Sequence, residues 1–199
     1  MPRRLSIACL AALAGLTAAC VSTSGGLLPE FDSWESRQAA LESEDEWSFT
    51  GRIGVRAGED GFNGNIQWRQ DGTVFRARIG GPIGIGTIFI NGDRRELTLT
   101  EQDGTVTELE DAEADLRDRY GWTIPVTSLR YWALGIPDPA SASDIRFNEE
   151  GLASEISQRD WHVAIDRYAD GGGQPMPRRV TALSGEIRVR LVIDDWAFR

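Results

Sequence analysis

Alternation of apolar and polar residues dominates the chain after residue 46. In the segment Trp47–Arg56 the odd positions carry apolar side chains or glycine, and the even positions are mostly polar. A period of two is typical of a β-strand with one face in a core and the other in water. The pattern returns in Phe62–Trp68 and in Val74–Ile79. These three segments are predicted to be successive strands that share one apolar face.

Turn signals and shorter apolar runs extend this pattern along the chain. Asp71-Gly72 is a strong hairpin signal, and Asn91-Gly92 and Asp103-Gly104 predict further turns. Additional strands are predicted at 87–90, 97–100, 105–109, 152–158, 161–168, 179–183 and 186–193. Most of the chain is therefore expected to form one long antiparallel sheet.

Three segments have the period and the ends of short helices. The first runs over 33–43, with Ser33 as its N-cap. The second runs over 111–120, with acidic residues in its first turn and arginines in its last. The third runs over 125–134 and is ended by Gly135. These helices are too few and too short to cover a long sheet fully.

A sheet with one apolar face must curl or be covered, and partial cover by helices would leave an apolar cavity. Such a cavity is where an apolar ligand would bind. The side chains expected to line it are those of Trp47, Phe49, Ile53, Val55, Phe62, Ile66, Trp68, Phe75 and Ile79.

The first nineteen residues have the organisation of a secretory signal peptide. Arg3 and Arg4 are basic, Leu5–Leu16 is almost entirely apolar, and Thr17–Ala19 are small. An apolar run of about 12 residues is short for a membrane span, which needs about 20. An uncleaved anchor is the alternative.

Cys20 directly follows these small residues, as the lipidated cysteine does in bacterial lipoproteins. Thr17 stands where that motif usually has Leu. Cys9 lies within the signal, so Cys20 would be the only cysteine of the mature chain and could form no internal disulfide. We expect Cys20 to carry lipid; an incidental free thiol is the alternative. Residues 20–30 then form a flexible tether, and 31–199 a single domain.

The net charge and the lack of catalytic motifs disfavour several classes of function. The net charge is −10, and removal of the signal arginines makes it more negative, which disfavours nucleic acid as a partner. His162 is the only histidine and is expected to face solvent. No catalytic triad or metal-ligand spacing can be built around it. We expect neither an enzyme nor a cofactor or metal.

One loop, Gly81–Gly86, carries large aliphatic residues where a polar tip is usual. Its expected membrane-contacting part is Pro82, Ile83 and Gly84. Ile83 either projects as an apolar finger that touches the bilayer or folds back into the core, and composition does not decide between these.

Short motifs from about Trp34 to Trp196 resemble the LolB family, the outer-membrane lipoprotein receptors of the lipoprotein localisation pathway. The motifs are Trp34 with Leu41, Gly51-Arg52, Trp68 with Gln70, Gly81-Pro82-Ile83-Gly84, Gly121-Trp122, Ile124-Pro125, Leu129, Trp132, Gly135-Ile136-Pro137, Gln158 before Trp161, Tyr168, Pro177, and Leu191-Val192-Ile193 before Trp196.

The resemblance implies a mainly β fold, an open and incomplete antiparallel barrel with short helices as its lid. It implies a monomeric receptor on the periplasmic face of the outer membrane. Such a receptor takes triacylated lipoproteins from a LolA-like periplasmic carrier and inserts them into outer-membrane lipid. Ile83 stands at the position of the family's exposed aliphatic residue, commonly Leu. Val21 after Cys20, in place of Asp, also favours the outer membrane.

Two other functions are compatible with the residues alone. The domain could be a lipid-anchored binding module for another hydrophobic ligand, or a structural lipoprotein of an envelope assembly complex. A binding module would share the cavity, whereas an assembly protein would present a flat apolar patch.

Overall fold

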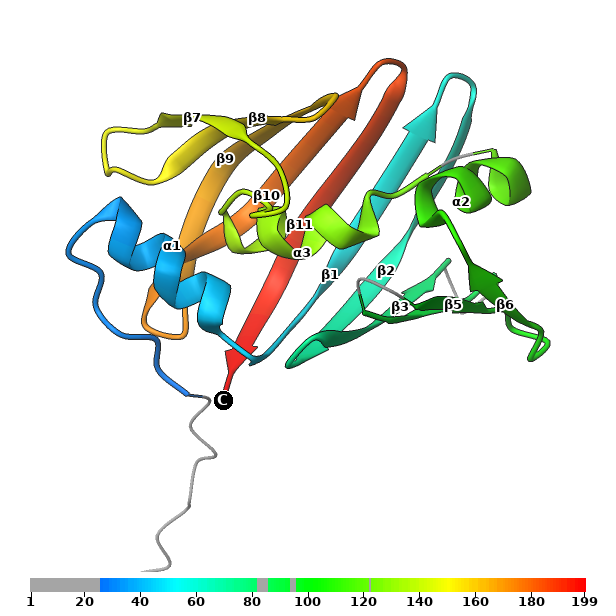
Figure 1. Cartoon of the computed structure of the whole chain (residues 1–199), viewed down its shortest axis with the longest axis horizontal. Helices are drawn as coiled ribbons and strands as arrows, with labels where there is room; N and C mark the ends of the chain where they lie inside the picture. The colour runs from blue at the N-terminus through cyan, green and yellow to red at the C-terminus, as the bar shows by residue number, and fades with distance from the viewer. Residues whose placement is uncertain (1–25, 82–85, 94–95, 122) are drawn as a thin grey trace, which may run out of the picture.

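The computed structural model describes residues 26–81, 86–93, 96–121 and 123–199. Its strands form one antiparallel sheet in the order β6-β5-β4-β3-β2-β1-β11-β10-β9-β8-β7 (Figure 1). The strands are β1 Glu46–Ala57, β2 Asp60–Asp71, β3 Val74–Gly80, β4 Ile88–Gly92, β5 Leu97–Thr100, β6 Val106–Leu109, β7 Ser143–Phe147, β8 Ala153–Gln158, β9 Trp161–Gly171, β10 Gln174–Ser184 and β11 Ile187–Phe198.

At the centre of the sheet, the first strand of the domain pairs with the last one. β1 pairs with β2 on one side and with β11 on the other. From β1 to β6, and again from β7 to β11, each strand pairs with its neighbour in sequence, as in a meander. The edges, β6 and β7, do not pair with each other, so the sheet is open. Both edge strands are short, which limits the unpaired backbone they expose.

Three helices lie in front of the sheet in Figure 1, all on one face. α1 spans Trp34–Ser43, and a capping box between Ser33 and Ser36 begins it. α2 spans Ala112–Tyr120; the Asp111 side chain caps it, and Gly121 ends it with a φ of 72°. α3 spans Val126–Leu134 and ends at Gly135, with a φ of 80°. These ends match the predicted caps, because glycine adopts the left-handed conformation without strain.

Several boundaries differ from the sequence prediction. Asn91-Gly92 is not a turn but the end of β4; the chain reverses after it, where Asp93 N donates to Glu96 O over 3.0 Å. β7 was not predicted. β10 begins at Gln174, five residues before the predicted start, although Pro175 and Pro177 lie in it. Proline is tolerated there because β11 pairs only from Arg179 onward and the register shifts at Pro177.

The apolar core fills the space between the sheet and the helices. Alternate residues of β1, β2 and β3 are buried, in agreement with the predicted alternation. We call this covered face the inner face and the opposite, polar face the outer face. Within the described residues, no helix is long and apolar enough to cross a membrane.

Candidate functional site

All nine residues predicted to line a cavity lie on the inner face. Eight of them are only 1–3 % exposed, and Phe62 is partly buried. They belong to one cluster with residues of α3 and the flanking strands. The sequence led us to expect a face left partly open by the helices. In the structure the inner face is covered far more completely, and the nine residues belong to one buried cluster that also contains side chains of α3, β8, β9 and β10.

Aromatic rings stack at the end of the inner face where β1 begins. Trp68 lies parallel to Phe75, with ring centroids 4.6 Å apart, and also stacks with Phe49 and Trp47 at 6.1 and 6.2 Å. From β11, Trp196 packs against Phe49 in an edge-on arrangement at 5.3 Å. The sequence prediction missed Trp196, because a bulge at Thr50/Gly51 brings it opposite Phe49.

The same bulge explains the Gly51-Arg52 motif. A Cβ atom at Gly51 would collide with the carbonyl oxygen of Val192. Glycine therefore allows β11 to approach β1 closely at the centre of the sheet. The register shift that follows sets which residues of β11 reach the aromatic stack.

Two buried indoles in the stack lack an acceptor. Trp47 Nε1 and Trp68 Nε1 have no hydrogen-bond partner among the described residues, and neither has the buried Gln70 Oε1. In contrast, Trp196 Nε1 donates to the Pro177 carbonyl over 3.0 Å. Unsatisfied buried polar atoms are costly, so a group that hydrogen-bonds to them would gain free energy.

A buried hydrogen-bond network fixes α3 to the sheet. Gln158 Oε1 on β8 accepts from Trp132 Nε1 at 3.1 Å and from Asp138 N at 2.9 Å. Gln158 Nε2 donates to the Asp138 and Ser141 carbonyls at 2.6 and 2.9 Å. Ser128 Oγ donates to Asp138 Oδ2 at 2.9 Å. Both ends of α3 and the segment after it are therefore held in place.

α1 buries fewer of its residues than α3, and one of them is a cation. Of its ten residues only Arg37 and Leu41 are buried. Arg37 Nη2 donates to the Pro175 carbonyl over 2.6 Å, and the guanidinium lies 5.2 Å from the Phe31 ring centroid. Burial lowers the pKa of Arg37 below its ordinary value. Arg37 Nε has no partner among the described residues.

α2 carries a carboxylate that is partly withdrawn from water. Burial raises the pKa of Glu113 above its ordinary value, and the nearby Arg159 opposes the shift. An exposed ion pair at 2.6 Å joins Arg119 Nη1 on the same helix to Glu101 Oε1. α2 thus meets the sheet through polar contacts as well as Leu116, which is buried.

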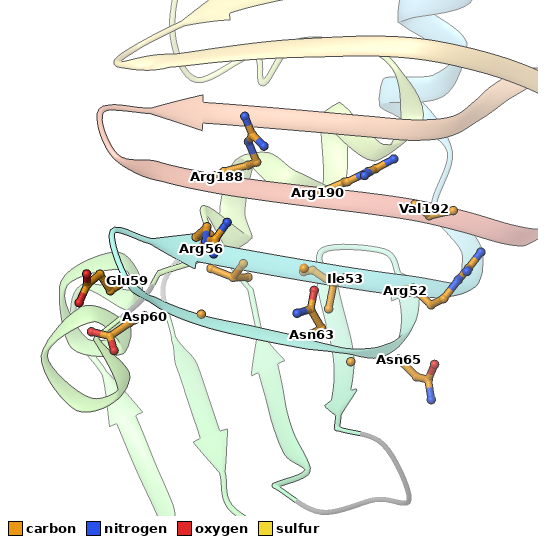
Figure 2. Close-up of a pocket in the computed structure, with 14 residues that line it drawn as sticks. Arg52, Ile53, Arg56, Glu59, Asp60, Asn63, Asn65, Arg188, Arg190 and Val192 are labelled. Atoms are coloured by element: carbon orange, nitrogen blue, oxygen red, sulfur yellow. The ribbon is translucent and has the colours of Figure 1, made fainter.

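The outer face contains a polar groove of about 970 Å³ over β1, β2 and β11. Figure 2 shows Arg52 and Arg56 on β1 and Arg188 and Arg190 on β11 around it. Gly54 and Gly61 contribute no side chains to its floor. In the sequence these arginines appear only as the polar side of the alternation, and nothing there indicates a role for them.

The structure describes only some of the remaining candidate residues. Cys20 and the loop residues Pro82, Ile83 and Gly84 lie outside the described residues. His162 is exposed, as expected, with Nδ1 3.3 Å from Ser157 Oγ. Among the residues that the structure covers, no group of three or more His, Cys, Asp or Glu could hold a metal ion.

Solved structures identify the class of fold. A LolA-superfamily protein from Nitrosomonas europaea superposes with a TM-score of 0.55 at 10 % identity, over 84 % of this chain and 94 % of that one. An outer membrane lipoprotein-sorting protein domain from Vibrio parahaemolyticus gives 0.51 at 10 % identity, over 83 % and 90 %. The open sheet with helices on one face is therefore a fold that this chain shares with these two proteins.

Sequence comparison identifies the family within this class. The model of the family described as outer membrane lipoprotein LolB matches residues 45–196. The outer-membrane lipoprotein LolB of Chromohalobacter salexigens is 32 % identical over 186 residues, covering 92 % of this chain and 86 % of that protein. That of Pseudomonas aeruginosa is 29 % identical over 191 residues, covering 96 % and 92 %. The chain belongs to the LolB family of outer-membrane lipoproteins, which confirms the resemblance stated above.

Proposed function

We propose that this chain accepts acylated lipoproteins from a soluble periplasmic carrier and transfers them into the outer membrane. The observation that carries the proposal is the large, mainly apolar inner face in a member of the LolB family. Exposure of an acyl chain to water costs about 0.8 kcal/mol per CH₂ group, so the three chains of a lipoprotein need a shielded route. Transfer would proceed because each successive site binds the chains more favourably.

The nine inner-face residues are the proposed acyl site. Because they are buried, acyl chains can enter only if part of the cover moves. α1 buries two of its ten residues and α3 seven of its nine, so α1 is the element expected to open. Hydrogen exchange with and without a long-chain acyl ligand tests this. Faster exchange in α1 with unchanged α3 is expected, and faster exchange in α3 alone would contradict it.

The indoles of Trp47 and Trp68 are proposed to donate hydrogen bonds to the ester carbonyls of the cargo's lipid. Trp68→Phe keeps the stacked ring and removes the donor. Binding of an acyl ester should weaken several-fold, consistent with about 1 kcal/mol for one hydrogen bond, while binding of an alkane of equal length should not change. Equal weakening of both ligands would assign Trp68 a packing role only.

Ile83, within Pro82–Gly84, is proposed to enter the bilayer during release of cargo. Burial of an aliphatic side chain in an apolar phase is worth about 1.5–3 kcal/mol, and a carboxylate reverses the sign. In a two-stage assay, Ile83→Glu should accept cargo from the carrier normally and fail to deliver it to liposomes. Ile83→Leu is the matched control and should deliver it. Failure of Ile83→Glu at the first stage would instead place Ile83 in the core or the carrier contact.

Cys20 is proposed to be the lipid-bearing residue after removal of residues 1–19, with residues 20–30 as tether. Mass spectrometry of the mature N-terminus should show acyl modification of Cys20. An uncleaved or unmodified Cys20 would contradict the assignment. A Cys20→Ala chain exported to the periplasm should still accept cargo, because the proposed acyl site lies in the domain.

Depletion of the protein separates this function from the two alternatives. If other lipoproteins then accumulate in the periplasm or the inner membrane, the chain transfers lipoproteins. Normal localisation of lipoproteins would favour a binding module for a different hydrophobic ligand. The loss of one particular envelope complex would favour an assembly role.

A further inference from the structure

The outer face carries exposed arginines that have no ion-pair partner within the part of the chain that the structure describes. Arg56 on β1 lies directly opposite Arg188 on β11, and Arg69 on β2 lies directly opposite Arg76 on β3. With Arg190 they form what we call the basic face, and all five are exposed. Like charges directly opposite each other destabilise a sheet. Among the described residues no carboxylate lies within ion-pair distance of any of the five.

The carboxylates on this side of the sheet lie beside the five arginines rather than among them. Arg52 is paired with Asp194, Nη2 to Oδ1 3.0 Å, and is not counted in the basic face. Glu59 and Asp60 flank the groove at the β1–β2 turn, and Glu46 and Asp71 lie at the opposite ends of the same strands. The outer positions of β1 and β2 between these ends carry no carboxylate. The basic face thus consists of two cationic groups on an acidic protein, Arg56 with Arg188 and Arg190, and Arg69 with Arg76; Asp194 and Asp195 of β11 lie between the two groups.

The chemistry of the side chains favours phosphate as the counter-charge. Arginine supplies the positive side-chain charge of the protein, because the sequence contains no lysine. The guanidinium fork binds phosphate oxygens in a bidentate manner, and it remains charged at any physiological pH. The groove over β1, β2 and β11 is lined by Arg56, Arg188 and Arg190, so an anionic group can lie among these three side chains (Figure 2).

The position of the lipid anchor places this face near the membrane. Gly26 N donates to the Phe198 carbonyl over 2.6 Å, so the tether reaches the domain beside the end of β11. Five residues lie between Cys20 and Gly26, so the six steps from one Cα to the other can span at most about 20 Å. Arg69 pairs with Ser48 near that same end of the sheet. From there the basic face runs about 26 Å along β1 to Arg56.

We propose that the basic face binds the phosphate groups of anionic phospholipids at the membrane surface. The domain then lies with its outer face on the membrane, and the helix-covered inner face is directed to the periplasm, where a carrier would approach. The inference rests on the proposed membrane anchoring. Its test contains no cargo and no carrier, so its failure is distinguishable from failure of the transfer function.

The experiment measures partitioning of the mature chain, residues 20–199 with Cys20→Ala, onto vesicles of phosphatidylcholine alone or with one third phosphatidylglycerol. The unlipidated chain should bind only the anionic vesicles, and 0.5 M salt should release it. Arg56→Gln/Arg188→Gln should reduce binding about thirtyfold at low salt, since each cation near an anionic surface contributes about a factor of five. Arg117→Gln/Arg146→Gln makes the same change of charge elsewhere and should bind like the parent chain.

Both double variants should retain the circular dichroism spectrum of the parent, because all four arginines are exposed. An equal loss of binding in both double variants would overturn the proposal, and so would equal binding of the parent chain to both kinds of vesicle. If Arg56→Gln/Arg188→Gln binds vesicles normally but loses binding to polyglutamate, the face docks an acidic protein segment, and the lipid assignment is wrong.

Discussion

The inner and outer faces of β1, β2 and β11 are made of alternate residues of the same segments, yet they are specified in different ways. On the inner face, Trp47, Phe49 and Trp68 interlock with one another and are at most 2 % exposed. On the outer face, Arg56 and Arg188 share only a sign of charge. The shape of the neighbouring side chains therefore limits which residues fit on the inner face, whereas only charge distinguishes the residues of the outer face. A substitution on the inner face should therefore change the free energy of unfolding. A substitution on the outer face should change which surfaces or molecules the protein binds.

Two neighbouring residues of β2 should show the largest difference in the free energy of unfolding between the two faces. Trp68→Ala should lower the free energy of unfolding by about 3–5 kcal/mol, because it removes a buried ring that stacks on Trp47, Phe49 and Phe75. Arg69→Ala, one residue away on the outer face, should change it by less than about 0.5 kcal/mol. Urea unfolding of both variants measures the difference. Similar costs at the two positions would mean that the two faces are not specified differently.

A buried and an exposed glutamine, Gln158 and Gln67, allow the same comparison of stability for polar side chains. Gln158→Leu should cost about 2–4 kcal/mol, because the indole of Trp132, the amide of Asp138 and two carbonyls lose their partners in a buried site. Gln67→Leu, on the outer face of β2, should be nearly neutral. Thermal unfolding reports both, and a neutral Gln158→Leu would show that α3 is held by its apolar contacts alone.

The sequence predicted the inner face well and the cover over it poorly. The period of two in β1, β2 and β3 is a local property, so the nine residues on the shared face followed directly from it. Which elements would cover that face depends on long-range packing. The role of Gln158, for example, arises only when β8 meets the segment after α3. Trp196 was missed as part of the stack for a similar reason, since the bulge at Thr50/Gly51 has no clear sequence signal.

The arginines of the outer face were visible in the sequence as alternating charges. Their arrangement in pairs was not, because it depends on the register between strands. Arg188 is more than a hundred residues from Arg56 in sequence, and only the pairing of the last strand with the first places them opposite each other. The register of one meander likewise places Arg69 opposite Arg76. The cationic surface is thus a consequence of topology.

The partly buried Glu113 on α2 predicts a pH effect of smaller size. Burial raises its pKa in the folded state, so its contribution to stability is fully present below the unfolded-state pKa and is lost as the pH rises through the folded-state pKa. Glu113→Gln should therefore gain about 0.5 kcal/mol over the parent at pH 7, a value kept small by residual contact with solvent. Below about pH 4 the difference should vanish. A variant less stable at pH 7 would show that the attraction of Arg159 dominates.

The smallest expected effect concerns the like-charged pair itself. Arg188→Thr removes one member of the Arg56–Arg188 pair and places a residue of high β-propensity on an exposed strand position. The free energy of unfolding should rise by about 0.3 kcal/mol at low salt, because repulsion between opposite residues is relieved. The gain should shrink at 0.5 M salt, where the Debye length falls below the separation of neighbouring strands. Arg52→Thr is the matched control on β1: it breaks the ion pair with Asp194 and should show no gain at low salt. If both variants gain equally and independently of salt, β-propensity accounts for the effect, and Arg56 and Arg188 do not repel each other in the folded protein.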